Sequence, residues 1–408
     1  MALLSHGRLL DAALATFRLE ALTGVQLWEV AALLAAARPA GLPAPGAPVT
    51  VASYAETQGF GAYQPPPAPF PLAPVAPAVI HGEPTADWPA LAALLQTRYP
   101  AAHPVQCAAV DPAGATGAPR ADTLAEIAAW PLEPAGVLLL YVPPLAPAAD
   151  GRGADGLRWV VTRLLAPGGC PWDVRQTHRS LRAALLEETH EVLEAIDADD
   201  LAALSEELGD LLIAVFSHSE MARQAGHFAL EDVLEQVTRK LIGRHPHVFA
   251  ELAVEGESQV LRNWEQIKAA ELAARGKSRA SALDGVPPTL PALAAAQKLG
   301  KKAARAGFNW ADVAQVWAKL QEELDELAVA AAAGDPRHAA EELGDALFVA
   351  TRLADWLGLD AEAALREANA KFRRRFTALE AAAAARGRPL AAMELDELLA
   401  LWDEAKRV

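Results

Sequence analysis

The chain has 408 residues, of which 52% are hydrophobic, and its formal net charge is −16 with a pI of about 5.1. This length predicts two to four domains with buried cores. The acidic balance argues against broad nucleic-acid binding, which needs a basic surface, so an anionic substrate must meet a local basic patch or a bound cation.

Two further features predict the compartment. Cys107 and Cys170 are the only cysteines, too few for a disulfide framework, which favours a reducing environment. The apolar stretch near the amino terminus is interrupted by charges such as Arg8, Asp11 and Arg18, so it does not resemble a signal peptide. Since no uncharged apolar run of about 18 residues occurs, we expect a cytoplasmic protein without membrane spans.

The first 150 residues are rich in proline, alanine and glycine, and the tract 64–77 (QPPPAPFPLAPVAP) predicts an extended, polyproline-like loop. Short apolar runs at 49–51, 105–110 and 137–142 predict strands. Together with helical patterns, they predict a small Pro-rich α/β or α+β domain. The helical segments are 8–18, 27–37, 86–98 and 122–129.

From about residue 155 onward the hydrophobic pattern becomes helical, in two sets. We expect a mainly α protein, with helical domains at 151–280 (the first repeat, with a connector) and 281–408 (the second repeat). The first set covers 157–165, 181–196, 201–222 and 230–242, with a connector helix near 259–275. The second set covers 292–306, 313–333, 336–357 and 361–385, and a terminal helix covers 391–406. Gly226 and Gly358 follow long helices as C-cap glycines do.

One pattern of carboxylates occurs in both repeats at one spacing, as EExxE followed by ELGD. Each acid of the second set lies 135 positions after its counterpart. The two sets are Glu187, Glu188, Glu191, Glu207 and Asp210, and Glu322, Glu323, Glu326, Glu342 and Asp345.

Helical geometry places these acids on facing surfaces. Glu187 and Glu191 are four residues apart, and Glu207 and Asp210 are three apart, so each pair shares a helix face. A turn near 197–200 reverses the chain, which allows the two faces to meet, and the second set repeats this construction around 334–336. Gly209 and Gly344, inside each ELGD, cost about 1 kcal/mol in mid-helix, which is understandable where a close approach is needed.

Several carboxylates in one cleft repel each other unless a cation neutralises them. Mg²⁺ prefers such oxygens and keeps waters and phosphates as further ligands, and Mn²⁺ is a natural substitute. No histidine–cysteine cluster of the type favoured by Zn²⁺ accompanies the acids. A single EExxE is usually a solvated helix face. The close apolar flanks and the repeat argue against that interpretation here.

These residues resemble the MazG family of nucleoside triphosphate pyrophosphohydrolases over roughly 155–385. The first repeat carries CPWDVRQTHRSL, LLEETHEVLEAI, EELGDLL and KLIGRHPHVF. The second carries KKAARAGFNW, EELDEL, EELGDALF and NAKFRRRF. The resemblance implies an all-α fold, dimerisation through a helix bundle, Mg²⁺ dependence, and cleavage of NTP to NMP and pyrophosphate. It also implies that the ten repeated carboxylates are the metal ligands.

Basic and aromatic residues beside the acids suit a nucleotide substrate. Trp172 and Trp310 either stack on a base or pack in the core, and His245 and His247 are expected to be structural or to contact phosphate. Cys170 is expected in a core or a turn. The residues predicted to bind substrate are Trp172, Lys240, Arg244, Lys268, Lys301, Lys302, Arg305, Trp310, Lys371, Arg374 and Arg375.

The predicted reaction is metal-assisted attack of water on the triphosphate, with Glu188 and Glu323 as the catalytic proton acceptors. Both sets of acids are complete, and the denser basic set favours the second repeat as the site of turnover. We expect a homodimer or a higher homo-oligomer that removes aberrant or excess (d)NTPs. Two alternatives stay open: a narrower substrate such as dUTP or phosphoribosyl-ATP, and a regulatory or scaffold protein that binds nucleotides without turnover.

The amino-terminal region is similar, at 17–33 and 98–144, to the carboxy-terminal half of a tetrapyrrole-methylase-like domain. The glycine-rich start that binds S-adenosylmethionine in such domains is missing. This resemblance implies a truncated remnant of such a domain without methyltransferase activity. The alternative is an unrelated Pro-rich domain.

Overall fold

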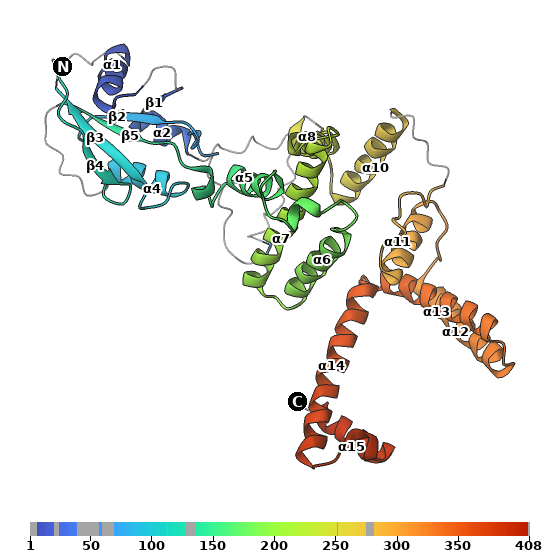
Figure 1. The fold of residues 1–408 in the computed structure, drawn as a ribbon. Helices are drawn as coiled ribbons and strands as arrows, with labels where there is room; N and C mark the ends of the chain where they lie inside the picture. Colours follow the sequence, from blue (N-terminus) through green and yellow to red (C-terminus); the bar gives the residue numbers. More distant parts are fainter. Residues whose placement is uncertain are drawn as a thin grey trace. The chain divides into compact units, whose positions relative to one another are not determined.

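The computed structural model describes residues 6–19, 24–38, 57–58, 69–111, 113–127, 136–250, 252–274 and 281–406. The chain is mainly α-helical (Figure 1) and forms two compact units, Met1–Ala269 and Ala270–Val408. Within the described ranges no helix is long and apolar enough to cross a membrane. The division into three domains near residues 150 and 280 stays a prediction.

The amino-terminal part of the first unit is a five-stranded sheet in the order β1-β2-β5-β3-β4. β1 is parallel to β2, and the other neighbouring pairs are antiparallel. The strands are β1 (Gln26–Glu29), β2 (Ala78–Gly82), β3 (Pro104–Val110), β4 (Arg120–Thr123) and β5 (Val137–Val142). The helices of this part are α1 (His6–Phe17), α2 (Val30–Ala36) and α4 (Trp88–Gln96).

Side chains on both faces of this sheet are buried. On one face Ile80 and Leu140 join the α2 and α4 residues Leu33 and Trp88 in one apolar cluster. On the other face α1 covers a smaller cluster that includes Val79 and Leu139. This two-sided burial explains why the central strands contain continuous apolar runs.

The sequence prediction for this region was partly wrong. The strands predicted at 105–110 and 137–142 are confirmed, and the helices predicted at 8–18 and 86–98 are confirmed as α1 and α4. The helix predicted at 27–37 is confirmed as α2 from Val30 onward, but its first residues belong to β1. β4 occupies the start of the helix predicted at 122–129, and the last two residues of that prediction lie outside the described residues. β2 follows directly after the Pro-rich tract and was missed. Both β1 and β4 are only four residues long, too short for a clear period of two. The strand predicted at 49–51 lies outside the described residues.

The helical predictions after residue 155 are confirmed to within a few residues. The first repeat contains α5 (Ala154–Leu165), α6 (Arg182–Asp197), α7 (Leu201–Gln224), α8 (Leu230–Arg244), α9 (Pro246–Phe249) and α10 (Glu257–Ala274), with 3₁₀ turns η3 (Pro147–Ala149) and η4 (Asp173–Arg175). The second contains α11 (Ala292–Arg305), α12 (Val313–Ala332), α13 (Pro336–Trp356), α14 (Ala361–Ala385), η5 (Leu390–Ala392) and α15 (Leu395–Ala405). Gly226 and Gly358 have φ of +73° and +70° after α7 and α13, as expected of C-cap glycines.

Two antiparallel helix pairs, α6–α7 and α12–α13, form the centre of the repeats. Asp200 caps α7 through the amides of Ala202 and Ala203, and Asp335 caps α13 in the same way. These two caps are 135 positions apart. The spacing found in the carboxylates therefore extends to the turns that set the helix register.

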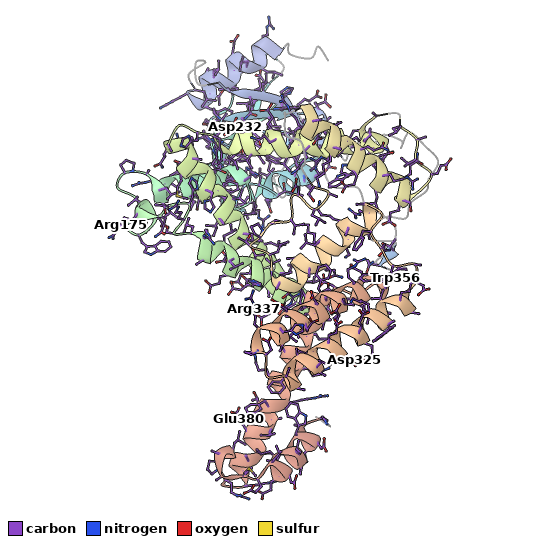
Figure 2. All side chains as sticks on the ribbon, turned by 90° about the vertical axis from the view of Figure 1, so that its right-hand side faces the viewer. Arg175, Asp232, Asp325, Arg337, Trp356 and Glu380 are labelled. Carbon is purple, nitrogen blue, oxygen red and sulfur yellow. The ribbon has the colours of Figure 1, made fainter. Side chains whose placement is uncertain are left out.

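A buried polar network fixes the helices of the second repeat around α13. The Arg352 guanidinium pairs with Asp355 and donates to Asn309, and Gln297 on α11 donates to Asp355 at 2.7 Å. A Cβ on Gly300 would overlap the Arg352 side chain, so glycine is required where α11 approaches α13. Figure 2 shows the side chains of this unit, with Asp325 on α12 and Arg337 at the start of α13.

Candidate active site

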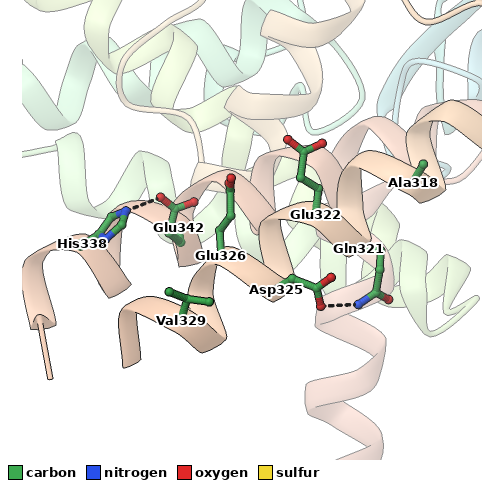
Figure 3. A pocket seen from close by; sticks show the side chains of 8 residues that line it. All are labelled: Ala318, Gln321, Glu322, Asp325, Glu326, Val329, His338 and Glu342. Carbon is green, nitrogen blue, oxygen red and sulfur yellow. Dashed lines mark hydrogen bonds and ion pairs between the residues drawn. The ribbon is translucent and has the colours of Figure 1, made fainter. Parts of the chain in front are cut away.

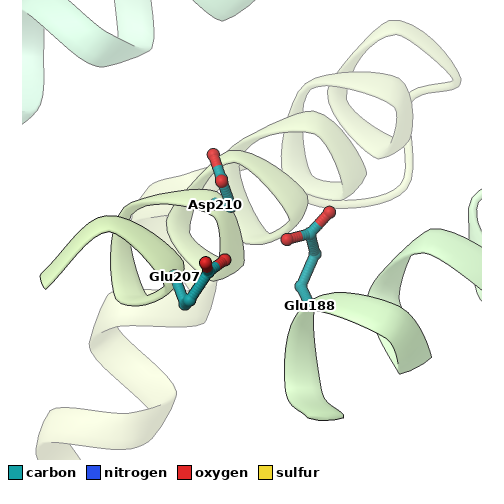
Figure 4. A group of neighbouring side chains, drawn as sticks. All are labelled: Glu188, Glu207 and Asp210. Atoms are coloured by element: carbon teal, nitrogen blue, oxygen red, sulfur yellow. The ribbon is translucent and has the colours of Figure 1, made fainter. Parts of the chain in front are cut away.

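Three of the five predicted acids of the first repeat come together across α6 and α7. Carboxylate oxygens of Glu188, Glu207 and Asp210 lie within 4.8 Å of one another (the first trio; Figure 4). Glu188 projects from α6 toward the two acids on α7. The trio is half-buried, whereas Glu187 and Glu191 are exposed.

The first trio carries charge that its own surroundings do not neutralise. Burial raises the pKa of Glu188, and the charges of Asp210 and Glu191 raise it further. The pKa of Glu207 is raised by burial and then by Glu191 and Asp210. Among the described residues no ion pair involves any member of the first trio. An external cation would remove this repulsion.

The second repeat has a similar cluster on α12 and α13, made by Glu323, Glu326 and Glu342 (the second trio), also within 4.8 Å. Glu323 and Glu342 correspond to Glu188 and Glu207, whereas Glu326 corresponds to Glu191 and stands where the first trio has Asp210. Glu323 is buried, with 5% of its surface exposed. Burial and the charges of Glu342 and Glu323 raise the pKa of Glu326. The other two predicted acids, Glu322 and Asp345, are exposed and lie outside this trio.

Basic side chains accompany the acids of the second repeat. The Lys319 ammonium lies 2.9 Å from carboxylate oxygens of both Glu322 and Glu323, and these contacts raise the pKa of Lys319. His338 Nε2 lies 2.9 Å from Glu342. Figure 3 shows Glu322, Glu342 and His338 lining a hollow of about 470 Å³.

The two repeats therefore differ beside the shared carboxylates. The positions 135 residues before Lys319 and His338 are Ala184 and Ala203, which carry no charge. The second trio is partly neutralised by Lys319 and His338 on its own helices, whereas the first trio has no such partner among the described residues. We therefore expect the first trio to depend more strongly on a bound cation.

In the first repeat, two of the predicted phosphate-binding residues meet over one aromatic ring. The Arg244 guanidinium lies 5.2 Å and the Lys268 ammonium 4.4 Å from the ring centroid of Trp264, distances at which cation–π attraction operates. Lys240 lies exposed on the same helix as Arg244. Trp264 thus holds two cations together, although the sequence analysis had not selected it.

In the second repeat, two predicted phosphate ligands have contacts within the protein. Lys301 lies 3.2 Å from Asp355, and Lys302 donates to the carbonyl of Asp284 at 3.0 Å. Arg305 ends α11. The cations Lys371, Arg374 and Arg375 lie on α14, whose main contacts are with α11, α13 and α15, so their proposed role at the second trio stays a prediction.

The two predicted tryptophans differ in their surroundings. Trp172 is 63% exposed, whereas Trp310 packs against an apolar cluster formed by Val316, Val349 and Leu353. Packing thus accounts for Trp310, and Trp172 keeps a ring accessible to a ligand.

The remaining candidates lie at turns and helix ends. His245 Nδ1 lies 2.7 Å from the carbonyl of Leu241 at the end of α8, consistent with a structural role. His247 lies beside it, with the ring centroids 5.7 Å apart. Cys170 lies in the turn after α5, where its amide donates to the carbonyl of Leu164.

Lys319 and His338 were not predicted as site residues, because the predicted cations come from basic motifs outside α12 and α13. Their signal was nevertheless present in the sequence: Lys319 stands four residues before Glu323, and His338 four before Glu342. At this spacing side chains on a helix meet. The same rule identifies Trp264, four residues before Lys268.

Comparison with known proteins agrees with this geometry. The MazG nucleotide pyrophosphohydrolase domain matches residues 176–249 and 312–378, the segments that carry the two trios. A nucleoside triphosphate pyrophosphohydrolase of Escherichia coli is 44% identical over 256 residues, which cover 62% of this chain and 97% of that protein. The chain belongs to the MazG family.

Two relatives from Thermotoga maritima complete the comparison. A nucleoside triphosphate pyrophosphohydrolase/pyrophosphatase MazG is 40% identical over 247 residues, covering 60% of this chain and 93% of that protein. A crystal structure of a MazG-related protein matches 28% of this chain and 96% of its own at 32% identity, with a TM-score of 0.25. The family match begins at residue 176, so the resemblance of the amino-terminal region to tetrapyrrole methylases stays a prediction.

Proposed function

We propose that this protein hydrolyses nucleoside triphosphates to nucleoside monophosphates and pyrophosphate, with Mg²⁺ held by the two trios. Membership of the MazG family and the names of its relatives support the reaction class. The observation that carries the proposal is a carboxylate trio on each of the two equivalent helix pairs, with two of its three positions shared.

The trios fit a hard divalent cation. All their donor atoms are carboxylate oxygens, which suit Mg²⁺ and also Mn²⁺. Burial, and then the neighbouring carboxylates, raise the pKa of Glu188 and of Glu207. Glu188, Glu207 and Asp210 would hold one ion, and Glu323, Glu326 and Glu342 the other. When bound, the cation neutralises phosphate charge and acidifies water.

The protein's own groups supply proton transfer and orientation. Glu188 and Glu323 are proposed to accept a proton from the attacking water, a role that usually contributes about 10²- to 10⁴-fold in rate. Glu187, Glu191, Glu322 and Asp345 lie outside the trios and are proposed to act as outer ligands or to orient water.

The proposed phosphate contacts differ between the repeats. In the first repeat, Arg244 and Lys268, which lie over the Trp264 ring, are proposed to contact the triphosphate. In the second, Lys319 can exchange its carboxylate partners for phosphate oxygens once a cation binds, because both are anionic. We propose the second repeat as the site of turnover, since Lys319, His338 and the adjoining hollow lie beside its trio.

We further propose that the protein is a cytoplasmic homo-oligomer that removes aberrant or excess nucleotides. Both helix pairs expose apolar residues at equivalent positions: Leu208, Leu212 and Ile213 on α7, and Leu343, Leu347 and Phe348 on α13. Such stripes are normally covered by another helical surface. A second pair of helices, from the same chain or from another, would cover them.

Product analysis tests the reaction. The full chain is incubated with a panel of NTPs and dNTPs, including dUTP, in Mg²⁺, and the products are separated by ion exchange. We expect NMP and pyrophosphate in equal amounts, with loss of activity in EDTA. Orthophosphate and NDP would show a different phosphohydrolase, and bound but unhydrolysed nucleotide would favour a regulatory protein.

Variants assign the turnover site. Glu323→Gln should lower the rate by about 100-fold or more, as expected for loss of a catalytic carboxylate, if the second repeat dominates. The matched variant is Glu188→Gln in the first repeat. A large loss in Glu188→Gln with a near-normal rate in Glu323→Gln would transfer turnover to the first repeat.

A further inference from the structure

Two histidines of the first repeat form a direct contact that the proposed reaction does not use. The Nδ1 atoms of His178 and His218 lie 2.8 Å apart, a hydrogen-bond distance, and their rings stack with centroids 5.1 Å apart and an angle of 11°. His178 is exposed and His218 is half-buried. One imidazole donates its Nδ1 proton and the other accepts it, so the bond needs at least one neutral ring.

This contact closes the open end of the α6–α7 pair. The loop at 198–200 joins the two helices at one end. At the other end, His178 stands four residues before α6, and His218 lies in the last third of α7. The acids of the first trio lie between these two ends. Among the described residues, the histidine pair is therefore a side-chain link between α7 and the segment that leads into α6, beyond the carboxylates.

The second repeat has apolar residues at the corresponding positions. The residues 135 positions after His178 and His218 are Val313 and Leu353. Val313 packs against the apolar cluster that contains Leu353. The alignment at this corner is supported by two matching hydrogen bonds, since Thr177 Oγ1 accepts from the Ser180 amide as the Asp312 carboxylate accepts from the Gln315 amide. The apolar contact of the second repeat does not titrate, whereas the histidine contact at the corresponding position of the first repeat does.

The surrounding charges do not favour a second proton on the pair. Arg175 donates to the carbonyl of Pro171, Arg163 donates to that of Gly168, and Glu220 is bound to Arg223. No carboxylate is bonded to either ring among the described residues. The charged side chains on the adjoining elements are Asp155, Arg158 and Arg163 on α5, Asp173 and Arg175 on η4, Arg179 and Arg182 beside His178, and Glu206, Glu207, Asp210, Glu220 and Arg223 on α7.

We propose that His178 and His218 are positioning residues that hold α6 against α7, so that the metal affinity of the first trio falls as the pair becomes doubly protonated. This inference rests on the proposed metal site. Two imidazolium rings cannot share a hydrogen bond and repel each other. The second trio lacks this dependence, because Val313 and Leu353 close its helix pair.

The direction of the pH effect follows from the folded state. Burial, and then the neighbouring His178, lower the pKa of His218 below its ordinary value of 6.5. The folded protein therefore binds fewer protons than the unfolded chain just below pH 6.5, and stability is lost as the pH falls through this range. Above this pH range, the hydrogen bond between His178 and His218 is fully formed.

The test measures Mn²⁺ binding to the first trio by electron paramagnetic resonance at pH 7.5 and pH 5.5. The full chain carries Glu323→Gln and Glu342→Gln, which remove the second trio. It is compared with the same chain carrying also His178→Val and His218→Leu, the residues of the second repeat. Because the carboxylates of the trio titrate in both proteins, the difference between them isolates the histidine pair.

We expect the dissociation constant to rise with acidification about fivefold more in the chain that keeps the histidines, the lower end of usual coupling between sites. Equal increases in both chains would overturn the positioning role and leave the metal site intact. Absence of Mn²⁺ binding in both chains at pH 7.5 would instead overturn the metal site, and this inference with it.

Hydrogen exchange of the wild-type chain provides a second measurement that needs no variant. Amide protection in the first turns of α6 is compared with that in the first turns of α12 at the same two pH values. The ratio cancels the intrinsic pH dependence of exchange. We expect α6 to lose protection relative to α12 at pH 5.5. An unchanged ratio would overturn the proposal even if the histidine variants did not fold.

Discussion

Burial, and then the charges of Asp210 and Glu191, make the ionised Glu188 carboxylate destabilising in the absence of metal. Because the pKa of Glu188 is raised in the folded protein, the stability associated with this group is present at low pH and lost as the pH rises through its folded pKa. At neutral pH without a cation, we therefore expect Glu188→Gln to raise the melting temperature. In saturating Mg²⁺ we expect the variant to have the lower melting temperature of the two proteins, because it has lost a metal ligand.

Differential scanning fluorimetry at pH 7.5, in EDTA and in Mg²⁺, measures the melting temperatures of the wild-type chain and of Glu188→Gln. Glu194→Gln, an exposed position on the same helix, is the matched control and should shift little in either condition. A lower melting temperature for Glu188→Gln in EDTA would show that Glu188 is compensated by a group in the protein.

Two glycines of the second repeat should respond to alanine with opposite signs. Gly334 has φ of +68° in the α12–α13 turn, where a Cβ costs roughly 1–2 kcal/mol. Gly344 lies inside α13, and a Cβ there would meet no atom within 4 Å. Gly344→Ala should therefore raise the free energy of unfolding by about 1 kcal/mol through helix propensity, and urea denaturation measures both variants.

The activity of Gly344→Ala tests whether the open space beside this glycine is needed for the reaction. No described protein atom explains the close approach that we expected at Gly209 and Gly344, since both positions face open space. If this space receives metal-bound water or substrate, the variant should be more stable and less active. Full activity would show that the glycine is dispensable.

At the level of helix packing, the Arg352 network should dominate the stability of the second unit. Arg352 is 4% exposed, and its removal leaves the Asp355 carboxylate buried with fewer partners. We expect Arg352→Ala to lower the free energy of unfolding by about 3–5 kcal/mol. Thermal unfolding followed by circular dichroism gives the measurement.

Arg337→Ala is the control for this effect. Arg337 pairs with Glu341 at 3.6 Å, and its side chain is 91% exposed, so the change should stay within about 1 kcal/mol. Similar losses in both variants would show that the buried network is not specifically stabilising.

For the whole molecule, the exposed apolar stripes on α7 and α13 predict association. Light scattering coupled to size exclusion should show a dimer or a larger oligomer, and Leu212→Glu should weaken it because charge cannot be buried at such an interface. Leu347→Glu is the equivalent change in the second repeat. A monomer whose stripe amides are protected from exchange would instead show that the repeats cover each other within one chain.

Patterns with a long period could be recognised without the fold. The 135-residue spacing and the periodicity of 3.6 predicted both helix pairs, their turns and the carboxylate faces, because α-helix geometry relates spacing directly to position. The amino-terminal sheet was less predictable. β1 and β4 have only four residues each, and pairing partners distant in the chain decided their conformation.

Folding decided which acids converge. Spacing alone treated the five acids of each repeat as equivalent, but the rotation of α6 against α7 places Glu188 in the first trio and leaves Glu187 exposed. The partners of the second trio, Lys319 and His338, could be recognised from the sequence, because each lies four residues before the acid that it contacts. The contact between His178 and His218 joins residues 40 positions apart, and such a contact exists only because α6 and α7 pack in this register.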